Sequence, residues 1–155
     1  MKRNVAHRTL MIFFLAMLPV SVGTSASAAT CSTATVAGSW AFTLTGTVIL
    51  PTGAVPAAAI AGGTADINGN ITGTEARNVG GGYADETVTG KWSVNRDCTG
   101  SFTVNVFQSG QLVRISVLSI VFDDNSKEVR MVQKSLTLPD GTELPVVITL
   151  EGKKQ

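Results

Sequence analysis

The chain has 155 residues, of which 44% are hydrophobic and 15% are charged, with 12 basic and 11 acidic side chains. A balance this close to neutrality excludes the basic surface that binding to nucleic acid or to an anionic membrane requires. The single histidine, His7, lies in an N-terminal segment that we expect to be removed. Its loss excludes histidine-dependent triads and histidine metal sites from the mature protein.

The N-terminal segment has the three parts of a secretory signal. Three basic residues within the first eight positions precede an apolar run over residues 10–18, and small residues ending at Ala29 provide a cleavage site. The apolar run is shorter than the roughly 20 residues of a membrane-spanning helix. We therefore predict a signal peptide over residues 1–29. Residues 30–155 then form one secreted or periplasmic domain with a net charge of −2 and no membrane insertion.

The mature chain contains two cysteines, Cys31 and Cys98. In an oxidising compartment the pair predicts one disulfide, which would stabilise the fold by about 4 kcal/mol in the chain-entropy model. The alternative is a reactive thiol, but the sequence places no lysine or histidine close to either cysteine to favour a thiolate.

Alternating apolar and polar residues with intervening turn signals predict strands along the whole mature chain, and no convincing amphipathic helix is found. Asn68-Gly69 predicts a type I′ turn. Both faces of residues 111–122 are mostly apolar, which predicts a strand covered on both sides. We expect residues 151–155 to fray. The eight predicted strands span residues 40–50, 57–67, 71–79, 83–95, 102–106, 111–122, 127–138 and 142–150.

Eight strands with mostly short connections favour an all-β, antiparallel up-and-down barrel, because closure removes exposed sheet edges. A two-sheet β-sandwich is the alternative, since alternation alone only gives each strand an inner and an outer face.

The hairpin over residues 87–110 supplies a large part of the predicted barrel interior. The same side chains either line a ligand-binding lumen or pack as a solid core. The predicted lumen residues are Trp40, Phe42, Leu44, Trp92, Val94, Phe102, Val104, Val106 and Arg114.

Arg114 is the charged residue within the most apolar strand. An interior arginine can bind the carboxylate or carbonyl of an apolar ligand. Alternatively, it stacks on Trp40 or Trp92 as part of the core.

Asp66, Asn68 and Asn70 have the spacing of the first ligands in a calcium loop, but Ile71 and Arg77 occupy positions that need glycine and glutamate. We interpret the segment as a hairpin turn and predict neither a metal site nor a cofactor.

Gly38-Ser39-Trp40 resembles the G-x-W motif of lipocalins, which belong to the calycin group. The resemblance implies an eight-stranded barrel in which the tryptophan closes one end and an arginine packs across it. Arg130 is the first candidate for that arginine and Arg114 the second. The chain also resembles small exported bacterial proteins of unassigned function that carry N-G-N and D-C-T-G turns and, more weakly, allene-oxide-cyclase-like barrels.

These observations predict an exported protein that binds a small apolar molecule without catalysis. One alternative is a cyclase-like barrel enzyme acting on an apolar substrate, for which Arg114, Glu128 and Tyr83 are the candidate inward polar residues. The other alternative is a structural or cell-surface interaction module.

Overall fold

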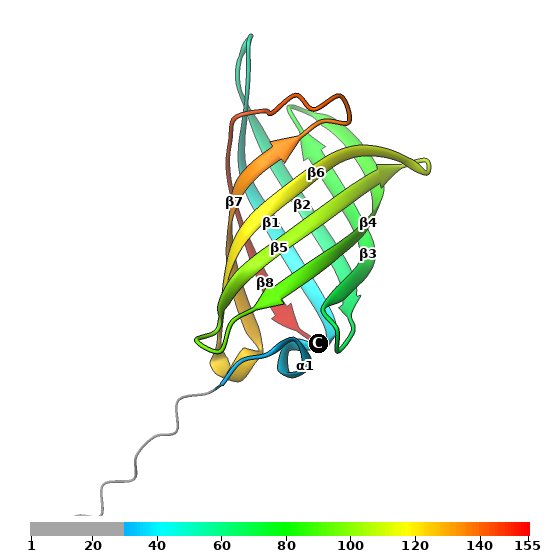
Figure 1. Cartoon of the computed structure of the whole chain (residues 1–155). Helices are drawn as coiled ribbons and strands as arrows, with labels where there is room; N and C mark the ends of the chain where they lie inside the picture. Colours follow the sequence, from blue (N-terminus) through cyan, green and yellow to red (C-terminus); the bar gives the residue numbers. More distant parts are fainter. Residues whose placement is uncertain (1–29) are drawn as a thin grey trace, which may run out of the picture.

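The computed structural model describes residues 30–155, and the predicted signal peptide lies outside the described residues. A one-turn helix precedes eight strands, and a short 3₁₀ turn separates the sixth strand from the seventh (Figure 1). Within residues 30–155, no helix has the length and apolar composition needed to cross a membrane. The elements are α1 (Thr33–Val36), β1 (Gly38–Leu50), β2 (Gly53–Ala65), β3 (Asn70–Val79), β4 (Gly82–Val94), β5 (Thr99–Gln108), β6 (Gln111–Asp123), η1 (Asp124–Ser126), β7 (Glu128–Thr137) and β8 (Val146–Lys154).

The strands form a closed antiparallel barrel in which each strand pairs with its neighbours in sequence. Closure occurs where β1 pairs with β8 as well as with β2, with Trp40 opposite Lys154 at one end of the pairing and Val48 opposite Val146 at the other. The predicted up-and-down barrel is therefore confirmed, and the two-sheet sandwich is excluded.

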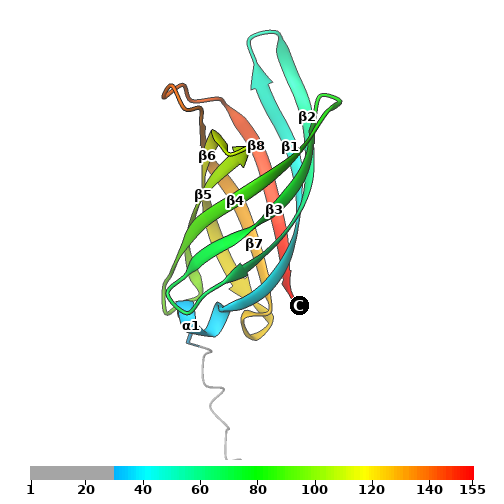
Figure 2. The same ribbon diagram turned by 90° about the vertical axis from the view of Figure 1, so that its right-hand side faces the viewer.

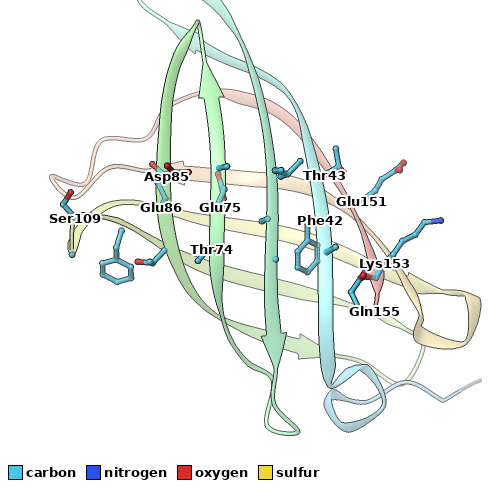
Figure 3. Close-up of a pocket in the computed structure, with 18 residues that line it drawn as sticks. Phe42, Thr43, Thr74, Glu75, Asp85, Glu86, Ser109, Glu151, Lys153 and Gln155 are labelled. Carbon is cyan, nitrogen blue, oxygen red and sulfur yellow. The ribbon is translucent and has the colours of Figure 1, made fainter.

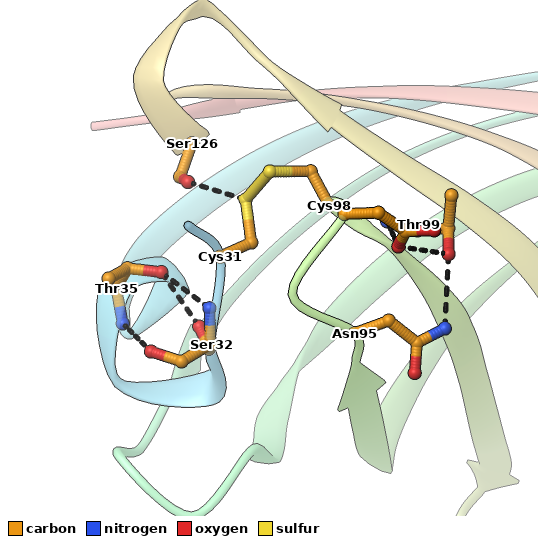
Figure 4. Close-up of a disulfide and its surroundings, with 8 residues drawn as sticks. Cys31, Ser32, Thr35, Asn95, Cys98, Thr99 and Ser126 are labelled. Carbon is orange, nitrogen blue, oxygen red and sulfur yellow. Dashed lines mark hydrogen bonds between the residues drawn. A yellow bond between two sulfur atoms is a disulfide. The ribbon is translucent and has the colours of Figure 1, made fainter. Parts of the chain in front are cut away.

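The short helix α1 closes one end of the barrel, opposite the projecting β1–β2 hairpin (Figures 1 and 2). The predicted disulfide between Cys31 and Cys98 is present and ties the residues before α1 to the β4–β5 turn (Figure 4). Val36 of α1 is fully buried, and its carbonyl accepts a hydrogen bond of 2.9 Å from the indole nitrogen of Trp40. A local N-cap at Ser32 and a long-range crosslink thus hold this end shut.

Aromatic side chains fill the half of the barrel next to α1. Trp92 makes edge-to-face contacts with Trp40 and Phe122, with ring centroids 5.3 and 5.2 Å away. Two inward-facing glycines leave the space for further rings. A Cβ at Gly90 would lie 2.6 Å from the ring of Phe102, and one at Gly152 would lie 2.5 Å from the ring of Phe42.

The C-terminal boundary of the barrel differs from the prediction. The tail does not fray, because β8 continues to Lys154. The backbone amide of Lys154 donates to the carbonyl of Lys127, and the backbone amide of Gln155 donates to the carbonyl of Ser39. The last strand starts at Val146, four residues later than predicted, because residues 138–145 form the β7–β8 connection.

Two further expectations are wrong in detail. β6 is not covered on both sides, since barrel closure leaves its outer face in water, where Val121 is 51% exposed. The β2–β3 turn is not type I′, which would need positive φ at both central residues. Only Gly69 has positive φ, at 82°, and its amide donates to the carbonyl of Asp66.

Candidate functional site

A cavity of about 240 Å³ occupies the barrel lumen between the aromatic cluster and the rim formed by the β1–β2, β3–β4 and β7–β8 connections, and it is partly open to solvent. Most of its wall is aliphatic. Ala57 and Ala59 on β2 leave room where larger side chains would fill the lumen. Other aliphatic wall residues include Leu44, Val48, Val104, Val106, Leu118, Leu136, Ile148 and Leu150.

All nine predicted lumen residues face the barrel interior, but only part of the set reaches this cavity. Leu44, Val104, Val106 and Arg114 line it. The remaining five residues, Trp40, Phe42, Trp92, Val94 and Phe102, belong to the packed half next to α1. The lumen is therefore divided into a solid aromatic half and a hollow aliphatic half.

Four charged side chains form one network, and three of them, Glu75, Arg77 and Arg114, line the cavity. Glu75 and Glu86 lie directly opposite each other on β3 and β4, an arrangement that is repulsive unless a cation lies between them. Arg114 supplies that cation, with its two terminal nitrogens 2.7 Å from Glu86 Oε2 and from Glu75 Oε1. The Nε of Arg77 donates to the second oxygen of Glu86 at 2.8 Å. The Glu86 side chain is completely buried, and both of its oxygens are paired with guanidinium groups.

The alternative in which Arg114 stacks on Trp40 or Trp92 is wrong, because its guanidinium group pairs with two carboxylates. Sequence reasoning missed Glu75, Arg77 and Glu86 as interior residues. The alternation along the strand could have identified Glu86, because residues an even number of positions apart point to the same face and Glu86 is so placed relative to the inward Val88 and Trp92.

The other inward polar candidates lie outside the barrel interior. Tyr83 is 65% exposed and donates a hydrogen bond to Asp85, while Glu128 pairs with Lys153. Arg130 is mostly exposed and pairs with Asp123, so it does not pack across Trp40 as the lipocalin resemblance implies. Arg114, the second candidate for that role, is occupied by the carboxylates.

The cavity has a second polar patch, on the β6–β7 side. The side-chain amide of Gln133 donates to Ser116 Oγ and to the carbonyl of Ser135, both at 3.0 Å. Both Gln133 and Ser116 are buried. The lumen therefore offers an aliphatic chamber with an ionic wall and a neutral polar wall.

A wider hollow of about 950 Å³ lies on the outer wall of the barrel (Figure 3). It extends from Glu151 and Lys153 on β8, across β1 to β4, to Ser109 in the β5–β6 turn. Many of the residues that line it, such as Ala41, Thr43 and Ile60, occupy outward-facing strand positions, so it is a depression of the outer surface and not a second lumen.

The segment with calcium-loop spacing is a hydrogen-bonded turn. The carboxylate of Asp66 accepts hydrogen bonds of 2.8 Å from the backbone amides of Asn68 and Asn70 and from the side chain of Asn70. These bonds lower the pKa of Asp66. Among residues 30–155, no group of three or more His, Cys, Asp or Glu side chains is placed to hold a metal ion.

Burial raises the pKa of Glu75 above its ordinary value of 4.5; Arg114 opposes this rise and Glu86 adds to it. Between pH 4.5 and the raised pKa, the folded protein binds more protons than the unfolded chain, so this group makes stability fall as pH rises. We expect Glu75→Gln to remove that fall, as measured by urea unfolding from pH 4.5 to 8. The same slope in both proteins would contradict the assignment. The pKa values of Asp66, Asp97 and Asp140 are lowered, so these groups change the stability only below pH 4.5.

Comparison with known proteins found no matching family model, no matching curated protein sequence and no matching solved structure. Any account of function therefore depends on the geometry of the barrel.

Proposed function

We propose that the protein is an exported, lipocalin-like binding protein that holds one small apolar molecule in the lumen cavity without changing it chemically. The observation that supports this most is the position of the cavity. An eight-stranded barrel is just wide enough for its side chains to fill it or for it to hold one small ligand. This chain fills one half with aromatic rings and leaves about 240 Å³ in the other.

The cavity volume limits the size of the ligand. It exceeds the roughly 150 Å³ of an engineered apolar cavity that takes up benzene. At roughly 30 Å³ for each water-sized group, it accommodates about eight non-hydrogen atoms. Short aliphatic chains and single aromatic rings are of this size, whereas long-chain lipids exceed it.

Binding is better supported than the enzyme alternative. That alternative depended on Arg114, Glu128 and Tyr83, and of these only Arg114 lines the cavity. The two terminal nitrogens of Arg114 donate to Glu75 and Glu86, so the geometry gives this side chain a structural pairing and not an orientation toward a reacting group. The interaction-module alternative leaves the cavity without a role.

Filling the cavity tests the proposal. Ala59→Phe adds a ring to the cavity wall, whereas Ala41→Phe adds the same ring to an outward-facing position on β1. We expect calorimetric titration with hexan-1-ol to give a dissociation constant of about 10 µM to 1 mM for the wild type and for Ala41→Phe. No binding is expected for Ala59→Phe. Absence of binding to the wild type, or equal binding to all three proteins, would refute the proposal.

A further inference from the structure

Arg77 is the member of the ionic network whose pairing is incomplete. It lies on β3 between Ala59 of β2 and Ala84 of β4, two small residues that leave its side chain accessible from the lumen. It lines the cavity, and its side chain is 25% exposed. Its Nε donates to Glu86, which fixes the position of that side of the guanidinium group.

The donors and acceptors of the network do not balance. Each oxygen of Glu86 accepts from an arginine, and each terminal nitrogen of Arg114 donates to a carboxylate. In contrast, the two terminal nitrogens of Arg77 have no hydrogen-bond or ion-pair partner among residues 30–155. A planar guanidinium edge with two free nitrogens matches the geometry of a carboxylate and can bind it through two parallel hydrogen bonds.

We propose that the ligand of this cavity carries a carboxylate, which binds the two terminal nitrogens of Arg77 while its short apolar body lies against the aliphatic wall. This inference rests on the proposed function, because it specifies the chemical class of the bound molecule. Arg77 is then the residue that determines specificity, and Glu86 is the residue that positions it.

The charges around the site make such binding sensitive to pH. The four side chains of the network are neutral in sum, so a bound carboxylate adds one uncompensated negative charge. Glu75 faces Glu86 on β4 and Arg114 on β6. It lies on the same side of β3 as Arg77. Its direct partner on β2 is the uncharged Ala61. Because burial already raises its pKa, Glu75 is the group that can take up the compensating proton. Affinity for a carboxylate therefore falls as the pH rises through the raised pKa of Glu75.

The test compares hexanoate with hexan-1-ol, which have nearly the same apolar body and different heads. At pH 6, we expect the wild type to bind hexanoate at least about tenfold more tightly than hexan-1-ol, because the hydrogen bonds to Arg77 are charge-assisted. Arg77→Met is expected to weaken hexanoate binding by at least about tenfold and hexan-1-ol binding by less than about threefold. Arg130→Met removes an equal charge from the exposed outer wall and is expected to leave both affinities unchanged.

The outcomes separate this inference from the proposed function. Binding of hexan-1-ol as tight as that of hexanoate to the wild type would overturn the carboxylate inference while leaving lumen binding intact. Binding of neither probe would overturn the proposed function. The comparison of the two probes in the wild type decides the inference even if Arg77→Met does not fold. Hexanoate affinity that rises as the pH is raised above the ordinary pKa of a glutamate would also contradict the arrangement.

Discussion

Replacing Arg114 by methionine is expected to destabilise the folded barrel by about 3–5 kcal/mol. The substitution keeps most of the side-chain volume but leaves Glu75 and Glu86 facing each other without the cation that bridges them. Glu86 retains its ion pair with Arg77, whereas Glu75 loses its ion pair with Arg114. Since folded domains are commonly stable by only 5–15 kcal/mol, a loss of this size is easily measured.

Urea unfolding monitored by tryptophan fluorescence provides the measurement, because Trp40 and Trp92 are both buried. Arg130→Met is the matched control and should change stability by less than about 1 kcal/mol, as is typical of an exposed ion pair. The double variant Arg114→Met/Glu75→Gln should recover part of the loss, because it removes one of the two facing charges. An Arg114→Met protein as stable as the wild type would show that the network is not needed to hold the carboxylates.

Loss of the Cys31–Cys98 disulfide is expected to cost about 4 kcal/mol, the second large effect. The crosslink joins residues 67 positions apart in sequence and therefore strongly restricts the unfolded chain. It also holds α1, with its buried Val36, against the end of the barrel that contains the aromatic cluster.

The double variant Cys31→Ala/Cys98→Ala tests this by urea unfolding in parallel with the wild type, with and without reductant. Cys98 has a φ of 67°, and alanine meets the same backbone strain there, so the variant reports mainly on the crosslink. Equal stability of the oxidised wild type and the double variant would contradict the expectation. Reductant should lower the stability of the wild type alone.

The architecture was largely predictable from the sequence because an alternation of period two runs through nearly every strand. The errors lie where tertiary pairing overrides local pattern. Thr142 to Leu144 alternates like a strand, yet these residues belong to a connection, whereas the polar residues 151–154 extend β8 because β1 and β7 supply partners for their backbone.

The candidate site was harder to predict for a physical reason. Glu75 and Arg77 share their phase on the strand with Ile71 and Val79, so the pattern already places them inside, although charged residues are usually exposed. The burial of Glu75 depends on Arg114, which is contributed by a distant strand, and no local window contains that information. Likewise, which half of the lumen is filled depends on strand register and on how the rings pack.

Intermolecular nuclear Overhauser effects from hexan-1-ol show whether a small apolar molecule occupies the lumen. We expect contacts between the hexyl chain and the methyl groups of Val104, Leu136 and Ile148, which line the cavity. Contacts confined to Ile60, which lies in the outer depression, or no contacts at all, would contradict binding in the lumen.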